Sequence, residues 1–131
     1  MKKKLTIARD FDFEAAHHLP DYGGACKYVH GHSYKLRVYV TFKRNTGKLT
    51  NGMLMDYHTL DALVKQVFVS KFDHCDLNDH FDIPTAEVMV NWMFDELNTR
   101  IPKQYKVSKV ILKETGKSYA IAEEVFDDEI L

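Results

Sequence analysis

Apolar and polar residues alternate along two stretches near the start of the chain, and this alternation predicts two strands that each bury one face. In the first stretch, with Arg9 as an interruption, the apolar face carries Leu5, Ile7, Phe11 and Phe13. In the second stretch, which follows His32, the apolar face carries Tyr34, Leu36, Val38, Val40 and Phe42. Turn-forming residues lie between the two stretches at 19–24, so we expect the strands to pair as a hairpin.

Two later stretches show helical spacing. The first helix is predicted from about Tyr57 to Lys71, with Asp56 as its N-cap and an apolar stripe of Leu60, Leu63, Val64, Val67 and Phe68. The second begins after Pro84, where Thr85 is a suitable N-cap and Glu87 suits the positive end of a helix. Its inner face is expected to carry Met89, Trp92, Met93 and Leu97, and Ile101-Pro102 ends it. Such stripes are typical of a packed core.

A second predicted hairpin completes the chain. Residues 107–113 and 119–125 have strand character, and Gly116-Lys117 provides the turn between them. The polar segment 72–80 has no period and is predicted to be a loop, and the acidic tail 127–131 is expected to be loose. We therefore predict one α+β domain over residues 1–131, with four antiparallel strands and two helices on one face of the sheet. The two open edges of so small a sheet favour an oligomer.

The composition excludes several classes of protein. The chain has 131 residues and a formal net charge of −1, which gives no electrostatic reason to expect nucleic acid as a partner. Lys2-Lys3-Lys4 is followed by a predicted strand, which does not fit a signal peptide, and no apolar run is long enough for a membrane span. Two cysteines favour a reducing cytoplasm over a disulfide framework.

Three histidines form the strongest candidate for chemistry. His30 and His32 are separated by one glycine in the predicted second strand, so their side chains share a face. His17 has the same phase at the end of the first strand, and the hairpin would bring it beside the other two. Three imidazoles with an open position are typical of catalytic zinc, and four filled positions are typical of structural zinc. Cys26 leaves the two alternatives open, because its thiolate could fill the fourth place.

Other polar residues offer weaker signals. Asp73-His74 could form a proton shuttle if the backbone turns there, because a carboxylate can orient an imidazole. Glu114 follows the apolar phase of the third strand, and its two oxygens suit a ligand with two parallel N–H donors. The alternative for Glu114 is a salt bridge to Lys113, Lys117 or Arg37. We expect His18, His58 and His80 to be surface residues and Cys75 to be an inert loop residue.

These residues together resemble the 6-pyruvoyl-tetrahydropterin synthase family. The resemblance covers nearly the whole chain and rests on the order and spacing of five motifs: Phe13-Glu-Ala-Ala-His17, Cys26-x-x-x-His30-Gly-His32, Asp73-His74-x-x-Leu77-Asn78, Pro84-Thr85-x-Glu87 and Lys113-Glu114-Thr115. Phe72 and Cys75 depart from the family pattern, which more often has Leu and a second polar residue at those positions.

The resemblance implies a fold, a cofactor and residue roles. It implies a tunnelling fold, in which subunits join their sheets into a β-barrel as a trimer or as a hexamer of two stacked trimers. It implies zinc on His17, His30 and His32, with Glu114 anchoring a pterin. Cys26 would abstract a proton, and Asp73 and His74 would complete the catalytic group across a subunit boundary. Thr85 and Glu87 would line the pocket, although helix capping explains Thr85 equally well.

The spacing between Cys26 and His30 distinguishes two activities within this family. The three-residue spacer resembles the branch that makes 6-carboxy-5,6,7,8-tetrahydropterin, with acetaldehyde and triphosphate, from 7,8-dihydroneopterin triphosphate on the queuosine and deazapurine pathway. The alternative is the pyruvoyl-forming branch, which has a longer spacer. A more distant alternative is a non-enzymatic pterin- or purine-binding domain, in which Cys26 and the three histidines enclose a structural zinc.

Overall fold

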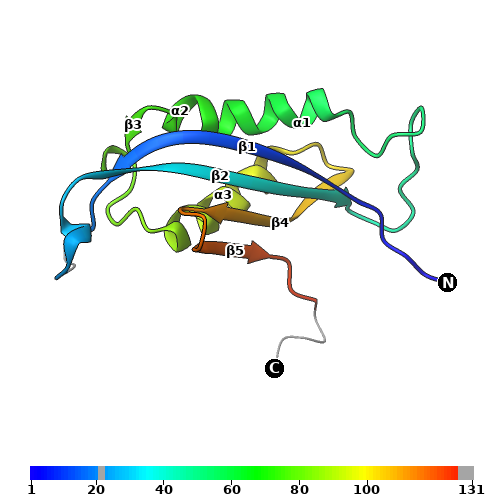
Figure 1. The fold of residues 1–131 in the computed structure, drawn as a ribbon. Coiled ribbons are helices and arrows are strands. Elements are labelled where there is room, and N and C mark those ends of the chain that lie inside the picture. The colour runs from blue at the N-terminus through cyan, green and yellow to red at the C-terminus, as the bar shows by residue number, and fades with distance from the viewer. Residues whose placement is uncertain (21–22, 127–131) are drawn as a thin grey trace.

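The protein is built around one five-stranded sheet (Figure 1). The computed structural model describes residues 1–20 and 23–126. The order in the sheet is β3-β1-β2-β4-β5. The strands are β1 (Thr6–His17), β2 (His30–Phe42), β3 (Cys75–Asp76), β4 (Tyr105–Lys113) and β5 (Tyr119–Glu123). Both predicted hairpins are confirmed, because β1 pairs antiparallel with β2 and β4 pairs antiparallel with β5.

The prediction of four antiparallel strands is wrong in one respect. The two-residue strand β3 lies within the segment that we predicted to be a loop, and it pairs parallel with β1 at Ala15 and Ala16, which makes the sheet mixed. A strand this short shows no alternation, so its pairing depends on the tertiary contacts of its neighbours.

The two predicted helical regions are confirmed. The first runs through α1 (Tyr57–Val64), the π-helical turn η2 (Lys65–Val69) and α2 (Ser70–Phe72), and the side chain of Asp56 caps it by accepting a hydrogen bond from the backbone of His58. The second is α3 (Ala86–Arg100), capped by Thr85. Two short 3-10 turns, η1 (Ala25–Lys27) and η3 (Leu77–Asp79), lie in the connections.

One face of the sheet packs against these helices to form the core. Alternate strand residues contribute the buried side chains Phe11, Phe13, Tyr34, Leu36, Val38, Val40, Val110 and Leu112. The helices contribute Leu60, Val64, Val67, Phe68, Met89, Met93 and Leu97, which belong to the same cluster. Both helical layers therefore cover the same face, as the alternation predicted. Leu5 is an exception, because it is exposed although it shares the apolar phase.

The other face of the sheet, which we call the outer face, carries charged pairs across β1 and β2. Asp10 lies opposite Arg37 and Asp12 lies opposite Lys35, with ion pairs of 2.7 and 3.2 Å. The sheet has two free edges in the single chain: β5, and the part of β1 before Ala15, where β3 does not reach. Among the described helices, none is long and apolar enough to cross a membrane. The acidic tail lies outside the described residues.

Candidate metal centre and adjoining groove

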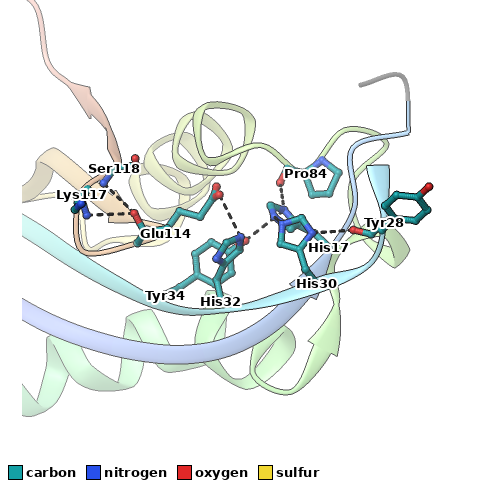
Figure 2. Close-up of polar contacts among 10 residues, drawn as sticks. His17, Tyr28, His30, His32, Tyr34, Pro84, Glu114, Lys117 and Ser118 are labelled. Atoms are coloured by element: carbon teal, nitrogen blue, oxygen red, sulfur yellow. Dashed lines mark hydrogen bonds and ion pairs between the residues drawn. The ribbon is translucent and has the colours of Figure 1, made fainter. Parts of the chain in front are cut away.

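The three predicted histidines form a compact cluster at one end of the β1–β2 hairpin (Figure 2). His17 and His30 are direct partners in the strand register, and His32 follows two residues further along β2. One nitrogen from each ring lies within 4.8 Å of the others, and Nε2 of His17 is 3.1 Å from Nε2 of His30. The hairpin thus brings His17 back beside the other two, as its strand phase predicted.

Backbone carbonyls orient two of the rings. Nδ1 of His17 is 2.7 Å from the carbonyl oxygen of Pro84, and Nδ1 of His30 is 2.8 Å from that of Tyr28. A carbonyl can only accept, so each Nδ1 carries the proton and each Nε2 is left with a free lone pair. Such outer hydrogen bonds are the usual way in which proteins fix the tautomer of a metal-binding histidine.

The third ring presents a buried nitrogen that has no hydrogen-bond partner among the described residues. Nε2 of His32 is buried, and although Oε1 of Glu114 lies 3.2 Å away, their geometry does not form a hydrogen bond. Burial lowers the pKa of His32, with the nearby Glu114 acting in the opposite direction, so the ring is kept neutral, as metal binding requires. Free Nε2 lone pairs on His17 and His30, with the neutral ring of His32 beside them, fit a divalent ion such as zinc.

Cys26 is not part of this cluster. Within the described residues, the group whose ligand atoms come together contains only the three histidines. Cys26 lies in η1, where its carbonyl accepts a hydrogen bond of 2.7 Å from the backbone N–H of Leu19. The arrangement therefore leaves a metal position open, which is typical of catalytic sites.

Tyr34 packs against two of the clustered imidazoles, with ring centroids 6.2 Å from His17 and 5.6 Å from His32. Its strand phase predicted only a core residue. It is fully buried, stacks on Phe13 with ring centroids 4.9 Å apart, and places its hydroxyl 3.4 Å from Nδ1 of His17. Burial raises the pKa of Tyr34, so the phenol stays neutral. Its position two residues after His32, on the same face, is the signal that could have identified it.

Glu114 lies between the cluster and a groove. It follows the last residue of β4, and its carboxylate points toward His32 (Figure 2). The alternative of a salt bridge to Lys113, Lys117 or Arg37 finds no support, because none of the ion pairs among the described residues joins Glu114 to these groups. Arg37 binds Asp10 instead, which raises the pKa of the guanidinium and lowers that of the carboxyl.

The groove runs between α3 and β5 and has a volume of about 820 Å³. It brings together two residues of the predicted substrate site, Glu87 and Glu114. Its walls also include Phe94 and Tyr119, so flat apolar surface lies beside the carboxylates. Thr85 is not among the residues that line this groove. Its hydroxyl accepts a hydrogen bond from the backbone N–H of Val88 and so caps the start of α3.

The side chains of Asp73 and His74 contact each other, as a proton shuttle would require. His74 has a φ of 60°, and this turn of the backbone brings its Nδ1 to 3.0 Å from Oδ1 of Asp73. The pKa of Asp73 is lowered, mainly because its carboxylate accepts a hydrogen bond from the backbone N–H of Glu14. The pair is therefore an ionised carboxylate beside an imidazole.

The Asp73–His74 pair opens toward the outer face of the sheet. The side chain of His74 is 79% exposed and lines a shallow pocket with Glu14 and Ser33, whose side chains are hydrogen bonded to each other on that face. The three imidazoles have the opposite strand phase and lie on the helix-covered face. Within one chain, the pair and the imidazoles thus lie on opposite faces.

The remaining histidines and Cys75 differ in their surroundings. His58 is exposed, as predicted, and His80 is exposed while packing against Phe72 with ring centroids 5.0 Å apart. His18 is only partly exposed, and its buried Nδ1 has no hydrogen-bond partner within residues 1–20 and 23–126. Cys75 lies in strand β3 and not in a loop as predicted, and burial raises the pKa of its thiol.

Comparisons with known proteins agree with this architecture. Residues 6–125 match the family described as 6-pyruvoyl tetrahydropterin synthase. The chain is 42% identical over 95 residues to the 6-carboxy-5,6,7,8-tetrahydropterin synthase of Synechocystis sp., covering 70% of this chain and 73% of that protein. It is also 27% identical over 121 residues to the dihydroneopterin monophosphate aldolase of Pyrococcus furiosus, covering 92% and 96%.

A solved structure supports the fold. The 6-pyruvoyl tetrahydropterin synthase of Caenorhabditis elegans superposes with a TM-score of 0.77 at 24% identity, covering 94% of this chain and 97% of that one. The family match spans almost all of the described chain and contains the hairpin, the three imidazoles and the groove. The chain therefore belongs to the 6-pyruvoyl tetrahydropterin synthase family.

Proposed function

We propose that this protein is a zinc-dependent lyase that converts 7,8-dihydroneopterin triphosphate and one water molecule to 6-carboxy-5,6,7,8-tetrahydropterin, acetaldehyde and triphosphate, for queuosine or deazapurine biosynthesis in the cytoplasm. The observation that carries the proposal is the cluster of three imidazoles, two of them with free Nε2 atoms, beside a carboxylate-lined groove. Several relatives named 6-carboxy-5,6,7,8-tetrahydropterin synthase support this reaction type.

The groove suits the ring of a pterin. Its volume of about 820 Å³ lies in the usual range for small-molecule sites. Glu114 would accept two parallel N–H bonds from the aminopyrimidinone edge of the ring, and charge-assisted pairs of this kind are both strong and directional. Glu87 adds a second carboxylate to the groove from the side of α3. These carboxylates would repel a triphosphate, so we expect the anionic end of the substrate to extend away from the groove.

His17, His30 and His32 would hold the metal through their Nε2 atoms. When bound there, zinc supplies Lewis acidity that makes the C–H and O–H bonds of the pterin side chain more acidic. The side chain of a pterin bound in the groove would reach the imidazoles, because Glu114 lines the groove and its Oε1 lies 3.2 Å from Nε2 of His32. Anchoring the ring at one end would thus place the reacting carbons beside the imidazoles, and such positioning supplies a large part of a rate enhancement.

Proton transfer is assigned to Cys26, His74 and Asp73. The Cys26 thiolate would take the proton from the side-chain carbon, and His74 would return a proton to the pterin as triphosphate leaves with the electron pair of its C–O bond. Water would then add to the first side-chain carbon and supply the second carboxyl oxygen. The bond between the first and second side-chain carbons would break, and its electron pair would take up a proton to give acetaldehyde. Asp73 would hold the imidazole of His74 in position through its Nδ1, from which it lies 3.0 Å. Because this pair lies on the opposite face of the sheet from the metal ligands of the same chain, it would serve the site of a neighbouring subunit.

The free sheet edges offer a way to bring neighbouring subunits together. We expect β5 of one chain to pair with the free part of β1 of the next, so that the sheets of three subunits close into a barrel. Two such trimers would stack to form a hexamer. The strand directions allow this, because β5 runs antiparallel to β1 within the sheet.

Product identification tests the proposed reaction. The zinc-loaded protein is incubated with 7,8-dihydroneopterin triphosphate, and the pterins and small aldehydes are identified by mass spectrometry, with His30→Ala as the matched inactive control. We expect 6-carboxy-5,6,7,8-tetrahydropterin and acetaldehyde. A pyruvoyl product would assign the chain to the alternative branch, and cleavage of a dihydroneopterin phosphate without triphosphate elimination would favour an aldolase like the Pyrococcus relative. Pterin binding without turnover would indicate a binding domain.

A further inference from the structure

The segment from Asp73 to Asn78 is attached along the end of β1 by contacts at both of its ends. At the first end, both backbone groups of Glu14 are satisfied: its N–H donates to Oδ1 of Asp73 at 2.9 Å, and its carbonyl accepts from the N–H of His74. The parallel pairing of β3 with Ala15 and Ala16 follows. The segment that carries the Asp73–His74 pair is therefore in register with the strand that carries His17.

Asn78 makes the contact at the other end. Its Oδ1 accepts from the backbone N–H of His18 at 2.9 Å, and its Nδ2 donates to the carbonyl of His18 at 3.0 Å. One side-chain amide thus replaces the two hydrogen bonds that a further strand residue would make, at the first residue after His17. Asn78 is itself held in place, because its backbone N–H donates to Asp76 at 3.0 Å and the preceding Leu77 is fully buried.

The next residue connects this contact to Cys26. The backbone N–H of Leu19 donates to the carbonyl of Cys26 at 2.7 Å. The dipeptide His18–Leu19 is therefore bound on one side by Asn78 and on the other by the segment that contains Cys26. A change in the direction of this dipeptide would move His17, whose ring has its own bond of 2.7 Å to the carbonyl of Pro84.

We propose that Asn78 is a positioning residue for the active site. By pairing with both backbone groups of His18, it sets the direction in which β1 ends, and so holds the His17 imidazole and Cys26 in a defined register with the Asp73–His74 segment. The roles of Cys26, Asp73 and His74 rest on the proposed function, but the effect on His17 does not.

Asn98 provides a matched control elsewhere in the chain. Its Nδ2 donates to the carbonyl of Val107 at 3.0 Å, and its Oδ1 accepts from the N–H of the same residue at 2.9 Å. The amide likewise pairs with both backbone groups of one residue, and its Nδ2 also donates to the carbonyl of Phe94 at 3.1 Å. This pairing joins α3 to β4 and does not involve the three imidazoles. Removing it should lower stability without disturbing the imidazoles.

The first test measures metal binding without substrate. Zinc affinity of the full chain is measured by competition with a chromophoric chelator, and the cobalt-substituted protein gives an absorption spectrum that reports ligand geometry. We expect Asn78→Ala to weaken zinc binding by about 10- to 100-fold, as outer-sphere changes do, and to shift the cobalt bands. Asn98→Ala should lower Tm to a similar extent and keep both the affinity and the spectrum.

A second variant keeps the test decisive if Asn78→Ala does not fold. Asn78→Asp has nearly the same volume and keeps an acceptor for the His18 N–H, but it loses the donor to the His18 carbonyl, so we expect the same direction of change. Unaltered zinc affinity and cobalt spectrum in a folded Asn78 variant would overturn the proposal. An equal loss of zinc affinity in Asn98→Ala would also overturn the proposal, because the loss in the Asn78 variants would then be explained by lower stability of the whole fold.

Steady-state kinetics then tests the link to the reaction. With dihydroneopterin triphosphate and saturating zinc, we expect Asn78→Asp to lower kcat by about 10- to 100-fold while KM changes little, because the groove is not touched. A change in KM alone would contradict a positioning role. If the wild-type protein turned over no pterin, the proposed function would fail, and the metal-binding comparison would still decide the role of Asn78.

Discussion

Backbone carbonyls orient two of the three clustered imidazoles. The carbonyls of Pro84 and Tyr28 set the tautomers of His17 and His30, and burial keeps His32 neutral. The strand phase of the three histidines was enough to predict the cluster. Main-chain carbonyls carry no signature in a sequence, however, so these two contacts could not be predicted. The pairing of Asn78 with His18 escaped prediction for the same reason.

Cys26 provides the sharpest test at the residue scale. Because its sulfur lies outside the imidazole cluster, we expect Cys26→Ala to bind zinc with unchanged affinity and to lose turnover by at least about 100-fold, the usual contribution of a positioned base. Metal content is measured by atomic emission and turnover by product formation. Cys75→Ala is the matched control and should retain activity. Loss of zinc in Cys26→Ala would make the cysteine a ligand and exclude the proposed base.

Glu114 is predicted to anchor the ring. Removing a charged partner of a hydrogen bond costs about 1.5–3 kcal/mol, so Glu114→Ala should weaken pterin binding by about 10- to 100-fold. The affinity is measured by titration calorimetry with a non-reactive pterin. Glu123→Ala, a carboxylate of the same groove that makes no contact with His32, is the control and should bind nearly normally. Unchanged affinity in Glu114→Ala would remove the anchor assignment.

At the scale of elements, the long periodic segments were predicted well and the irregular ones were not. The hairpins and both helical regions follow from alternation and helical spacing, and the caps at Asp56 and Thr85 were also predicted. Strand β3 was missed because two residues show no period. The π-helical turn at Lys65–Val69 was missed because the apolar stripe of α1 continues through it with helical spacing. Both features depend on contacts that form only in the folded chain.

Substitution of Thr85 distinguishes a role in capping α3 from a role in lining the substrate pocket. Its hydroxyl caps α3 and it does not line the groove, so Thr85→Ala should lower the free energy of unfolding by about 0.5–2 kcal/mol and leave KM nearly unchanged. Thr85→Ser keeps the cap and should keep most of the stability. Urea unfolding and initial rates measure the two effects. An increase of KM in a folded Thr85→Ala protein would instead support the pocket-lining role that the family resemblance implies.

At the scale of the whole molecule, the two faces of the sheet carry different groups. The helix-covered face holds the core and the three clustered imidazoles, whereas the outer face carries paired charges and the Asp73–His74 pair. The sequence predicted the division of faces, since it follows from alternation. It did not predict that the two chemical groups lie on opposite faces of one chain, because that depends on how the segment around β3 is attached to β1.

The free edge of β5 is expected to hold the assembly together. Backbone hydrogen bonds from Glu114 to Ser118 and from Glu124 to Ser108 set the alternation along this hairpin, which places the N–H of Ile121 on the edge away from β4. Ile121→Pro should therefore preserve the hairpin and prevent edge pairing. We expect light scattering to show a monomer for this variant and an oligomer for the Ile121→Val control. An unchanged mass would exclude β5 as the pairing edge.

Under the roles proposed for the imidazoles and the Asp73–His74 pair, their placement on opposite faces means that each reaction centre would draw on two chains. Each protomer would lend its acid–base pair to one centre and its metal to another. Two inactive proteins, His30→Ala and His74→Ala, should then regain part of the activity when they are co-expressed, since some junctions combine an intact metal site with an intact pair. Dilution below the dissociation constant of the assembly should abolish turnover in the same preparation. Each of these variants should stay inactive when it is expressed alone.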